Sequence, residues 1–332
     1  MIHETQSHTA SFADAIRYAL TDAMAEDETI VLLGQDVGIG FPWGVTRGLV
    51  ELFGSERVRD TPISEAATMG CGIGAAMTGL RPVVEVDFSG FLYLGMDQLI
   101  NNAAKLRYMS GGQVRVPLVV RLGQGALGSF AAQHSQSQYN MLLNVPGLAL
   151  CVPSAPQEAY DLMRWSLRQH DPVVFAEDMR LYRARGEISR SESILTPFPR
   201  TLTKREGTHA SVICFGYGAI QALEAAAELH TEGIEIEVLA LQTLPPLDLD
   251  NIRDSISRTG RVVCVGDDPL LGGVTATLSA IAYEEAYTAL RAPVLRVGSQ
   301  HAPVPYASQL ESAVIPSAKT ITEAVRALVQ WT

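Results

Sequence analysis

The sequence has 332 residues, of which 47% are hydrophobic and 18% are charged, and its formal net charge at pH 7 is −11. This length and composition are typical of a globular protein with two domains, each large enough to bury its own core. The acidic balance disfavours nucleic acids and anionic membranes as partners. No apolar run approaches the roughly 18 residues that a membrane helix requires. The polar start of the chain resembles neither a secretion signal nor a transit peptide, so we expect a cytoplasmic protein.

Short apolar segments alternate with helical patterns along the first 180 residues. Strands bounded by helices in this way predict a parallel sheet that is buried on both faces. In such sheets, ligands bind at the carboxyl ends of the strands. The predicted strands are 29–33, one ending at 59, 83–87, 117–121, 148–152 and 172–177; the predicted helices are one from Ser11 to about 24, 46–53, one after 65, 95–109 and 155–169.

The most distinctive stretch is Asp-Thr-Pro-Ile-Ser-Glu at 60–65. Pro62 fixes its own φ and disfavours a helical conformation for the residue before it, so the chain turns here. The Ser64 hydroxyl could cap the helix that follows by accepting a first-turn amide. Glu65 would then open a helix rich in small residues over 66–76. A first-turn carboxylate usually complements the helix dipole, so the local sequence by itself favours a structural role over a catalytic one.

Two other side chains share this position relative to a predicted strand. Phe91 follows the strand 83–87, and His134 lies in a polar setting after the glycine-containing loop 123–128. Because Glu65, Phe91 and His134 all come after a strand's carboxyl end, their common placement favours a functional interpretation. Phe88 precedes Phe91 closely, and core packing is the default expectation for one of the two.

The second half of the chain is predicted to form a smaller α/β domain. Residues 181–206 lack a clear period, and we interpret them as a linker between a domain at 1–180 and a domain at 207–332. The glycines near 216 and 272 do not complete a dinucleotide-binding loop, since Gln221 occupies the place of the third glycine. The predicted strands are 210–215, 234–240, 261–265 and 293–297, and the predicted helices are 218–230, 248–258, 273–289 and 317–330.

Four cysteines are scattered along the chain, without metal-ligand or redox-motif spacing. Each stands beside apolar or small residues, so we expect buried, reduced thiols. They are Cys71, Cys151, Cys214 and Cys264.

Several long motifs, in order, resemble one family. They are Asp-Thr-Pro-Ile-Ser-Glu at 60–65, Gly-Leu-Arg-Pro-Val-Val-Glu at 79–85, Ala-Lys-Leu-Arg-Tyr-Met-Ser-Gly-Gly at 104–112, Gln-His-Ser-Gln-Ser at 133–137, Pro-Gly-Leu at 146–148 and Asp-Pro-Val at 171–173. Over essentially the whole length, the chain resembles the β subunits of thiamine-diphosphate-dependent 2-oxo acid dehydrogenases, which include subunits acting on pyruvate, branched-chain 2-oxo acids and acetoin. The resemblance implies a transketolase-like fold: a pyrimidine-binding domain and a C-terminal domain that mainly supports assembly.

The resemblance also implies roles for the conspicuous side chains. Glu65 would bond to the pyrimidine nitrogen of thiamine diphosphate and drive the tautomer that removes the thiazolium proton. Phe91 would stack on the aminopyrimidine, while Ile63 would contribute to the same cofactor-binding region. His134 would face the reacting centre, steadying the substrate carboxylate or transferring a proton during acyl transfer to a lipoyl group.

This sequence departs from the family pattern near the expected cofactor site. Gln35 stands where relatives usually carry a glutamate that belongs to an acidic network, and Asp87 stands where they usually carry glutamine. Both residues are expected to lie in the cofactor-binding region. The loop 38–45, which borders the substrate, is shortened. The resemblance also suggests a potassium ion bound through backbone oxygens at Leu118, Ser166, Leu167, Gln169 and Asp171.

The chain lacks Gly-Asp-Gly followed by a distant Asn, the usual motif for magnesium and diphosphate. We therefore expect Mg²⁺ and its ligands on an α subunit in an α2β2 assembly, with a lipoyl acyltransferase as a further partner. The expected reaction is decarboxylation of a 2-oxo acid and transfer of the acyl group to lipoyl. Two alternatives remain: a divergent thiamine-dependent carboligase that forms acyloins, and a non-enzymatic assembly subunit.

Overall fold

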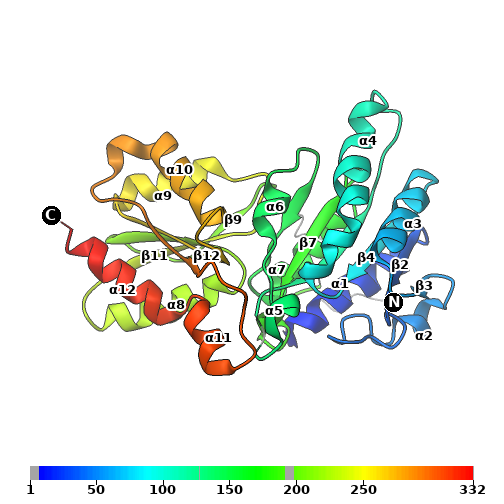
Figure 1. Ribbon diagram of the computed structural model, residues 1–332, viewed down its shortest axis with the longest axis horizontal. Coiled ribbons are helices and arrows are strands. Elements are labelled where there is room, and N and C mark those ends of the chain that lie inside the picture. The colour runs from blue at the N-terminus through cyan, green and yellow to red at the C-terminus, as the bar shows by residue number, and fades with distance from the viewer. Residues whose placement is uncertain (1–6, 127, 191–197, 332) are drawn as a thin grey trace. The chain divides into compact units, whose positions relative to one another are not determined.

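A computed structural model describes residues 7–126, 128–190 and 198–331. The chain divides into two compact units (Figure 1). The first contains Met1–Gln124 and Asn144–Pro197, and the second contains Gly125–Leu143 and Phe198–Thr332. Among the described residues, no helix is both long enough and apolar enough to cross a membrane.

The first unit is built on a six-stranded sheet in the order β3-β2-β4-β5-β7-β6. Every neighbouring pair in this sheet is parallel, as the alternation of apolar segments and helices predicts. The central strands are buried along most of their length, which matches their near-continuous apolar sequences. The strands are β2 (Ile30–Gly34), β3 (Val58–Asp60), β4 (Arg81–Val86), β5 (Val119–Gln124), β6 (Ala149–Cys151) and β7 (Val173–Asp178).

Helices pack on this sheet through apolar and small residues. Helix α1 (Phe12–Glu26) is capped by the Ser11 hydroxyl and packs against α7 (Pro156–Ser166). Helix α3 (Glu65–Met77) lies on β4, and a Cβ added at Gly72 would come within 2.6 Å of Val84. The small residues of α3 therefore bring its backbone close to the sheet. Helix α2 (Leu49–Phe53) is shorter than the predicted 46–53.

The long helix predicted at 95–109 is wrong in detail. The region contains a 3₁₀ helix η1 (Ser89–Gly95), a π-helix η2 (Gln98–Ala103) and the short α-helix α4 (Ala104–Met109). Gly95 packs against the first turns of α3, where an added Cβ would lie 3.4 Å from the Glu65 carbonyl oxygen. The spacing of apolar residues predicted a helix here, but it could not distinguish 3₁₀, π and α segments within it.

The second unit has a five-stranded sheet in the order β13-β12-β10-β11-β9, in which only β9 runs antiparallel to its neighbour. Figure 1 shows α9 and α10 on one side of this sheet and α8 and α12 on the other. The strands are β9 (Thr201–Arg205), β10 (Ala210–Cys214), β11 (Ile236–Leu241), β12 (Val262–Pro269) and β13 (Leu295–Ser299). The helices are α8 (Gly218–His230), α9 (Leu249–Thr259), α10 (Val274–Ala286), η4 (Tyr287–Ala289), α11 (Ser308–Val314) and α12 (Ala318–Val329).

Parts of the predicted linker form paired strands. Strand β8 (Arg185–Ile188) pairs with β1 (His8–Ser11) in a two-stranded antiparallel sheet, and β9 joins the second unit. Residues 191–197 of the linker, and 1–6 of the polar start, lie outside the described residues. The second unit also takes in 125–143, with α5 (Ala131–His134) and α6 (Tyr139–Leu143), which the sequence had placed in a domain at 1–180.

The cysteines follow the prediction at three positions only. Cys151, Cys214 and Cys264 are buried and free, and burial raises the pKa of each thiol to about 12. Cys71 is exposed, so the expectation of a buried thiol is wrong there. It lies on the outward face of α3, where the surrounding small residues gave no sequence signal of exposure.

Candidate active site

The order of strands in the first sheet reverses between β2 and β4. From β2 the chain passes outward to β3, then returns to the other side of β2 with β4 and continues to β5. Parallel sheets bind ligands at such a switch point, outside the carboxyl ends of the strands. Gln35 directly follows β2, and Asp87 directly follows β4. The topology therefore brings both positions to the edge of the sheet where a ligand is expected.

Glu65 is the first residue of α3, and the turn after β3 leads to it. The turn is held by the Thr61 amide, which donates to the Gly34 carbonyl at 2.9 Å, and by the Thr68 hydroxyl, which donates to Thr61 Oγ1 at 3.2 Å. Glu65 is half-buried, while Ile63 is 74% exposed. The carboxylate is thus presented at the same edge as the switch point.

The predicted capping by Ser64 is wrong in part. Ser64 occupies the N-cap position of α3, but among the described residues its hydroxyl accepts no hydrogen bond from the first turn. Its backbone carbonyl accepts from the Thr68 amide at 2.9 Å. The first-turn amides of α3 are therefore not engaged by this hydroxyl, and a negative charge near Glu65 benefits from the helix dipole.

Asp87 carries a perturbed carboxyl group. Burial raises its pKa to about 6, against the opposing effect of Arg121, and the nearby carboxylates Asp36 and Glu65 raise it further. Its position is fixed by Gly123 of β5, where an added Cβ would lie 2.3 Å from the Asp87 carbonyl oxygen. The Asp87 Oδ1 atom is buried and has no hydrogen-bond partner among the described residues. Asp87 therefore offers a free acceptor within an acidic group.

Aromatic rings line up beside this acidic group. Phe91 meets Phe88 edge to face at 6.0 Å between ring centroids, and Phe88 meets Trp43 at 5.7 Å. Trp43, from the loop 38–45, stacks on Tyr182 at 5.0 Å. Phe88 and Phe91 are both half-buried. Phe88 thus packs between two aromatic rings, while the stacking of Trp43 on Tyr182 links the loop 38–45 to the residues that follow β7.

A buried ion cluster below the site was missed by the sequence analysis. Arg121 is 2% exposed and donates from Nε and Nη2 to the two carboxylate oxygens of Glu177, each at 2.8 Å. It also pairs with Glu85, which the parallel register places beside it, and the Tyr182 hydroxyl donates to Glu177 at 2.7 Å. Burial raises the pKa of Glu85 to about 7, with Arg121 opposing the shift. The sequence does contain a signal for this cluster, because the apolar strands β4, β5 and β7 each carry a charged residue.

His134 belongs to the second unit. It ends the four-residue helix α5 and is half-buried. The preceding backbone is left-handed at Ser129 and Ala131, where φ is +63° and +60°. The Gly125 amide donates to the Gln136 carbonyl at 2.9 Å and closes the segment around the histidine.

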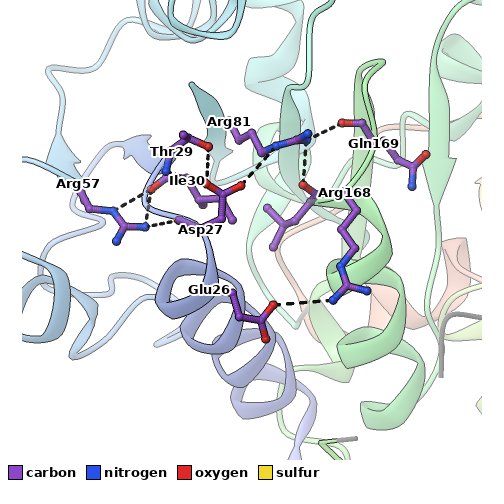
Figure 2. A network of polar contacts seen from close by, with 9 residues as sticks. Glu26, Asp27, Thr29, Ile30, Arg57, Arg81, Arg168 and Gln169 are labelled. Carbon is purple, nitrogen blue, oxygen red and sulfur yellow. Dashed lines mark hydrogen bonds and ion pairs between the residues drawn. The ribbon is translucent and has the colours of Figure 1, made fainter. Parts of the chain in front are cut away.

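Four of the five backbone oxygens suggested for potassium, those of Leu118, Ser166, Leu167 and Gln169, accept hydrogen bonds from the protein. Arg81 donates to the carbonyls of Leu167 at 3.2 Å and Gln169 at 2.8 Å (Figure 2). The Leu118 carbonyl accepts from Val173 and the Ser166 carbonyl from Gln169, while the Asp171 side chain pairs with Arg107. Arg81 and Leu167 border a cavity of about 230 Å³ at the amino ends of β2 and β4, the opposite edge of the sheet from Glu65.

The residues at the switch point fit the pyrimidine half of thiamine diphosphate. An aminopyrimidine presents N–H donors and a flat ring; Glu65 and the open Asp87 oxygen supply acceptors, and Phe91 supplies an apolar ring face. Across the described residues, no group of three or more His, Cys, Asp or Glu side chains is arranged to hold a metal ion.

Comparisons with known proteins divide the chain into two domains and assign residues 125–143 to the first of them, unlike the division into compact units. Residues 8–185 match the pyrimidine binding domain of transketolase, and residues 200–321 match the transketolase C-terminal domain. A solved structure described as a split gene transketolase, an inactive β4 tetramer, superposes with a TM-score of 0.77. The superposition covers 97% of this chain and 98% of the transketolase chain. Because the sequence identity is 19%, the likeness shows the fold alone.

Curated relatives narrow the assignment. The acetoin:2,6-dichlorophenolindophenol oxidoreductase subunit beta of Bacillus subtilis is 40% identical over 320 residues, covering 92% of this chain and 93% of that protein. The 2-oxoisovalerate dehydrogenase subunit beta of the same species is 38% identical over 97% of this chain and 99% of that protein. The pyruvate dehydrogenase E1 component subunit beta of Rhizobium meliloti is 36% identical over 98% and 71%.

The fold and the two matching family models define a transketolase-like chain with a pyrimidine binding domain. The chain belongs to the family of β subunits of thiamine-diphosphate-dependent 2-oxo acid dehydrogenases. It is an enzyme subunit and, as a β subunit, has an α subunit as its partner. This confirms the predicted fold class and family.

Proposed function

We propose that this β subunit, together with its α subunit, decarboxylates a short 2-oxo acid and passes the acyl group to a lipoyl domain of an acyltransferase partner. The observation that carries the proposal is the half-buried Glu65 at the start of α3, at the sheet edge where Asp87 and Phe91 also lie. The names of the relatives, which include pyruvate and 2-oxoisovalerate dehydrogenases, support the substrate class. The α2β2 assembly and the cytoplasmic location stay predictions.

Each side chain has a distinct proposed role. When bound, thiamine diphosphate supplies a carbon nucleophile and an electron sink for decarboxylation. Glu65 holds a proton shared with the pyrimidine nitrogen, and Phe91 packs against the ring. Ile63 and Gln35 border the same region. His134 steadies the substrate carboxylate or donates a proton during acyl transfer.

We further propose that Asp87 supplies the acidic group that Gln35 does not carry. The Gln35 amide lies 3.4 Å from Asp36 Oδ2, so it contributes a donor rather than a carboxylate. Burial, and to a lesser extent the charges of Asp36 and Glu65, raise the pKa of the Asp87 carboxyl group to about 6. On this proposal the acidic group at the switch point follows β4 instead of β2.

Replacing Asp87 with Asn should stabilise the isolated chain at pH 8 by up to about 3 kcal/mol, since a pKa raised from 3.8 to about 6 corresponds to that penalty on the ionised form. A raised carboxyl pKa favours the folded state below the unfolded pKa of 3.8, and this contribution is lost as the pH rises through 6. The gain from Asp87→Asn should therefore shrink to roughly half at pH 5. Urea unfolding followed by tryptophan fluorescence measures the difference.

Asp254→Asn, at an exposed position of α9, is the matched control and should change stability little at either pH. An equal gain from Asp87→Asn at pH 5 and pH 8 would show that packing, rather than ionisation, is responsible. A loss of stability of Asp87→Asn at pH 8 would contradict the inference that burial destabilises the ionised Asp87 carboxylate.

One face of α3 is left uncovered in this chain. Ala67, Gly70, Cys71 and Gly74 recur at helical spacing and are all exposed. Around Gly74, an added Cβ would meet no atom within 4 Å. Large exposed apolar side chains lie at the end of α3 and on other helices of the first unit: Met77 in α3, Tyr93 and Leu94 in η1, and Tyr108 and Met109 in α4. We propose that this surface docks the α subunit, whose residues would complete the cofactor site with Mg²⁺ and diphosphate ligands.

The isolated chain should bind thiamine diphosphate weakly and turn over no substrate, because a diphosphate site needs a metal with oxygen ligands and polar donors. Adding the α subunit with magnesium should restore binding and activity. Calorimetry on the isolated chain measures the first expectation. Tight, magnesium-dependent binding without the partner would overturn it.

Gly74→Leu distinguishes docking from folding. In an exposed helix interior this change should raise the stability of the isolated chain by about 1 kcal/mol, since glycine is a poor helix former. The added side chain should nonetheless weaken assembly with the α subunit. Ala227→Leu, at an exposed position of α8, is the control. Unchanged assembly of Gly74→Leu would remove this face of α3 from the interface.

The function itself is tested by assaying the co-purified αβ complex, with thiamine diphosphate and magnesium, against a panel of 2-oxo acids and a lipoyl domain. We expect decarboxylation coupled to lipoyl acylation for at least one short 2-oxo acid. Acyloin formation without lipoyl acylation would favour a carboligase instead. A potassium ion at the oxygens of Leu118, Ser166, Leu167, Gln169 and Asp171 stays a prediction, which added K⁺ in the same assay would test.

A further inference from the structure

The segment Gly125–Leu143, which carries His134, is anchored at several places within the second unit. Tyr139 is 1% exposed and meets Phe215, after β10, edge to face at 5.0 Å between ring centroids. The side-chain amide of Asn140 donates from Nδ2 to the Gly272 carbonyl at 3.2 Å. These two contacts hold the part of the segment that follows the histidine.

The backbone that precedes the histidine is held by a carboxylate of α11. Glu311 is 5% exposed, and its two oxygens accept hydrogen bonds from the amides of Gly128 at 2.9 Å and Ser129 at 2.8 Å. Both residues have left-handed backbone, with φ of +90° and +63°. A carboxylate that accepts two backbone amides forms strong, charge-assisted bonds and fixes their direction.

The surroundings of Glu311 indicate what this carboxylate is for. It is the buried residue of α11, a helix whose other side chains are mostly exposed. Burial of a carboxylate is costly unless its hydrogen bonds are satisfied, and the two amides satisfy it. The helix α5 that ends at His134 has only four residues, too few to hold its own shape. The backbone that enters α5 must therefore be fixed from outside.

We propose that Glu311 is a positioning residue for the proposed acyl-transfer step, acting through the backbone of 128–129 on His134. This inference rests on the proposed function of His134. It also gives the second unit a role in the reaction besides assembly.

The test is a double-mutant cycle in the assembled αβ complex with thiamine diphosphate and magnesium. Glu311→Gln, which is nearly isosteric, should lower the rate of lipoyl acylation by about 10- to 100-fold, the scale on which partners that orient a functional group act. Exchange of the thiazolium proton, which depends on Glu65, should be unchanged. Ser312→Ala, at the exposed next position of α11, is the control and should leave acylation unaffected.

The same substitution made in the His134→Ala background should cause no further loss, because a residue that acts through His134 has nothing left to position. Equal losses in both backgrounds would show that Glu311 only stabilises the fold and would overturn the proposal. Amide exchange in the unsubstituted complex gives an independent measurement: the N–H groups of Gly128 and Ser129 should be protected. Exchange at the rate of a free loop would also overturn the proposal.

Failure of the His134 assignment gives a different pattern. If His134→Ala acylates lipoyl normally, the proposed function of the histidine is wrong, and the proposal that Glu311 acts through it falls too. Amide protection at Gly128 and Ser129 that is lost in Glu311→Gln would then still establish that the carboxylate holds the segment.

Discussion

Glu65→Gln should abolish cofactor activation in the assembled complex while the complex itself stays intact. The substitution is nearly isosteric, and the half-buried side chain lies at a helix start, so packing should change little. The amide cannot hold the proton that the carboxyl group shares with the pyrimidine nitrogen. Exchange of the thiazolium proton for deuterium, followed by NMR after rapid acid quench, should slow by about two to four orders of magnitude, the usual scale for lost acid–base assistance.

Glu51→Gln is the matched control, because Glu51 is exposed and also lies in the first turn of a helix, α2. If a first-turn carboxylate mattered only through the helix dipole, the two substitutions would both cost a few tenths of a kcal/mol of stability and leave exchange alone. An unchanged rate of thiazolium-proton exchange in Glu65→Gln would show that Glu65 does not share a proton with the pyrimidine nitrogen.

His134→Ala should bind thiamine diphosphate normally and still lose acyl transfer to lipoyl. The histidine lies in the second unit, on a segment anchored by residues of that unit, whereas the acidic group at the β2–β4 switch point lies in the first unit. Loss of a general acid–base group should slow lipoyl acylation by about 10²- to 10⁴-fold. Calorimetry measures cofactor binding, and mass spectrometry of the lipoyl domain measures acylation.

His230→Ala is the control within the same unit, since His230 is exposed at the end of α8 and pairs with Glu235. Normal acylation by His134→Ala would reduce the histidine to a structural residue. A native complex that forms acyloins and never acylates lipoyl would instead support the carboligase alternative.

Much of the fold follows from patterns that the sequence displays directly. Apolar strands such as Ile30–Gly34 and Val173–Asp178, separated by helices, predicted the parallel sheet because only burial on both faces accommodates such runs. The sequence could not show that β8 pairs with β1, because that pairing joins short strands far apart in the chain. Helix α11 was missed for a related reason: seven residues hold too few turns to display a period.

The site was predictable only in part. Glu65, Phe91 and His134 stood out because each follows a predicted strand, and the family motifs named their roles. The buried cluster of Arg121, Glu85 and Glu177 depends on the register of three strands, which no local pattern specifies. The link between Glu311 and the histidine segment spans 183 residues, so nothing near either position indicates it.

The anchoring of the histidine segment has a consequence for biosynthesis. Gly128 leaves the ribosome 183 residues before Glu311, a delay of about 10 to 40 s at typical elongation rates. Phe215 and Gly272, the other anchors, also follow the segment in the chain. Once Asp178 has been added, the nascent chain contains every strand of the first sheet, yet the Glu311 carboxylate that holds Gly128 and Ser129 has still to be made. Until α11 has been made, the amides of Gly128 and Ser129 lack this partner, so the backbone that leads into His134 reaches its final conformation only late in synthesis.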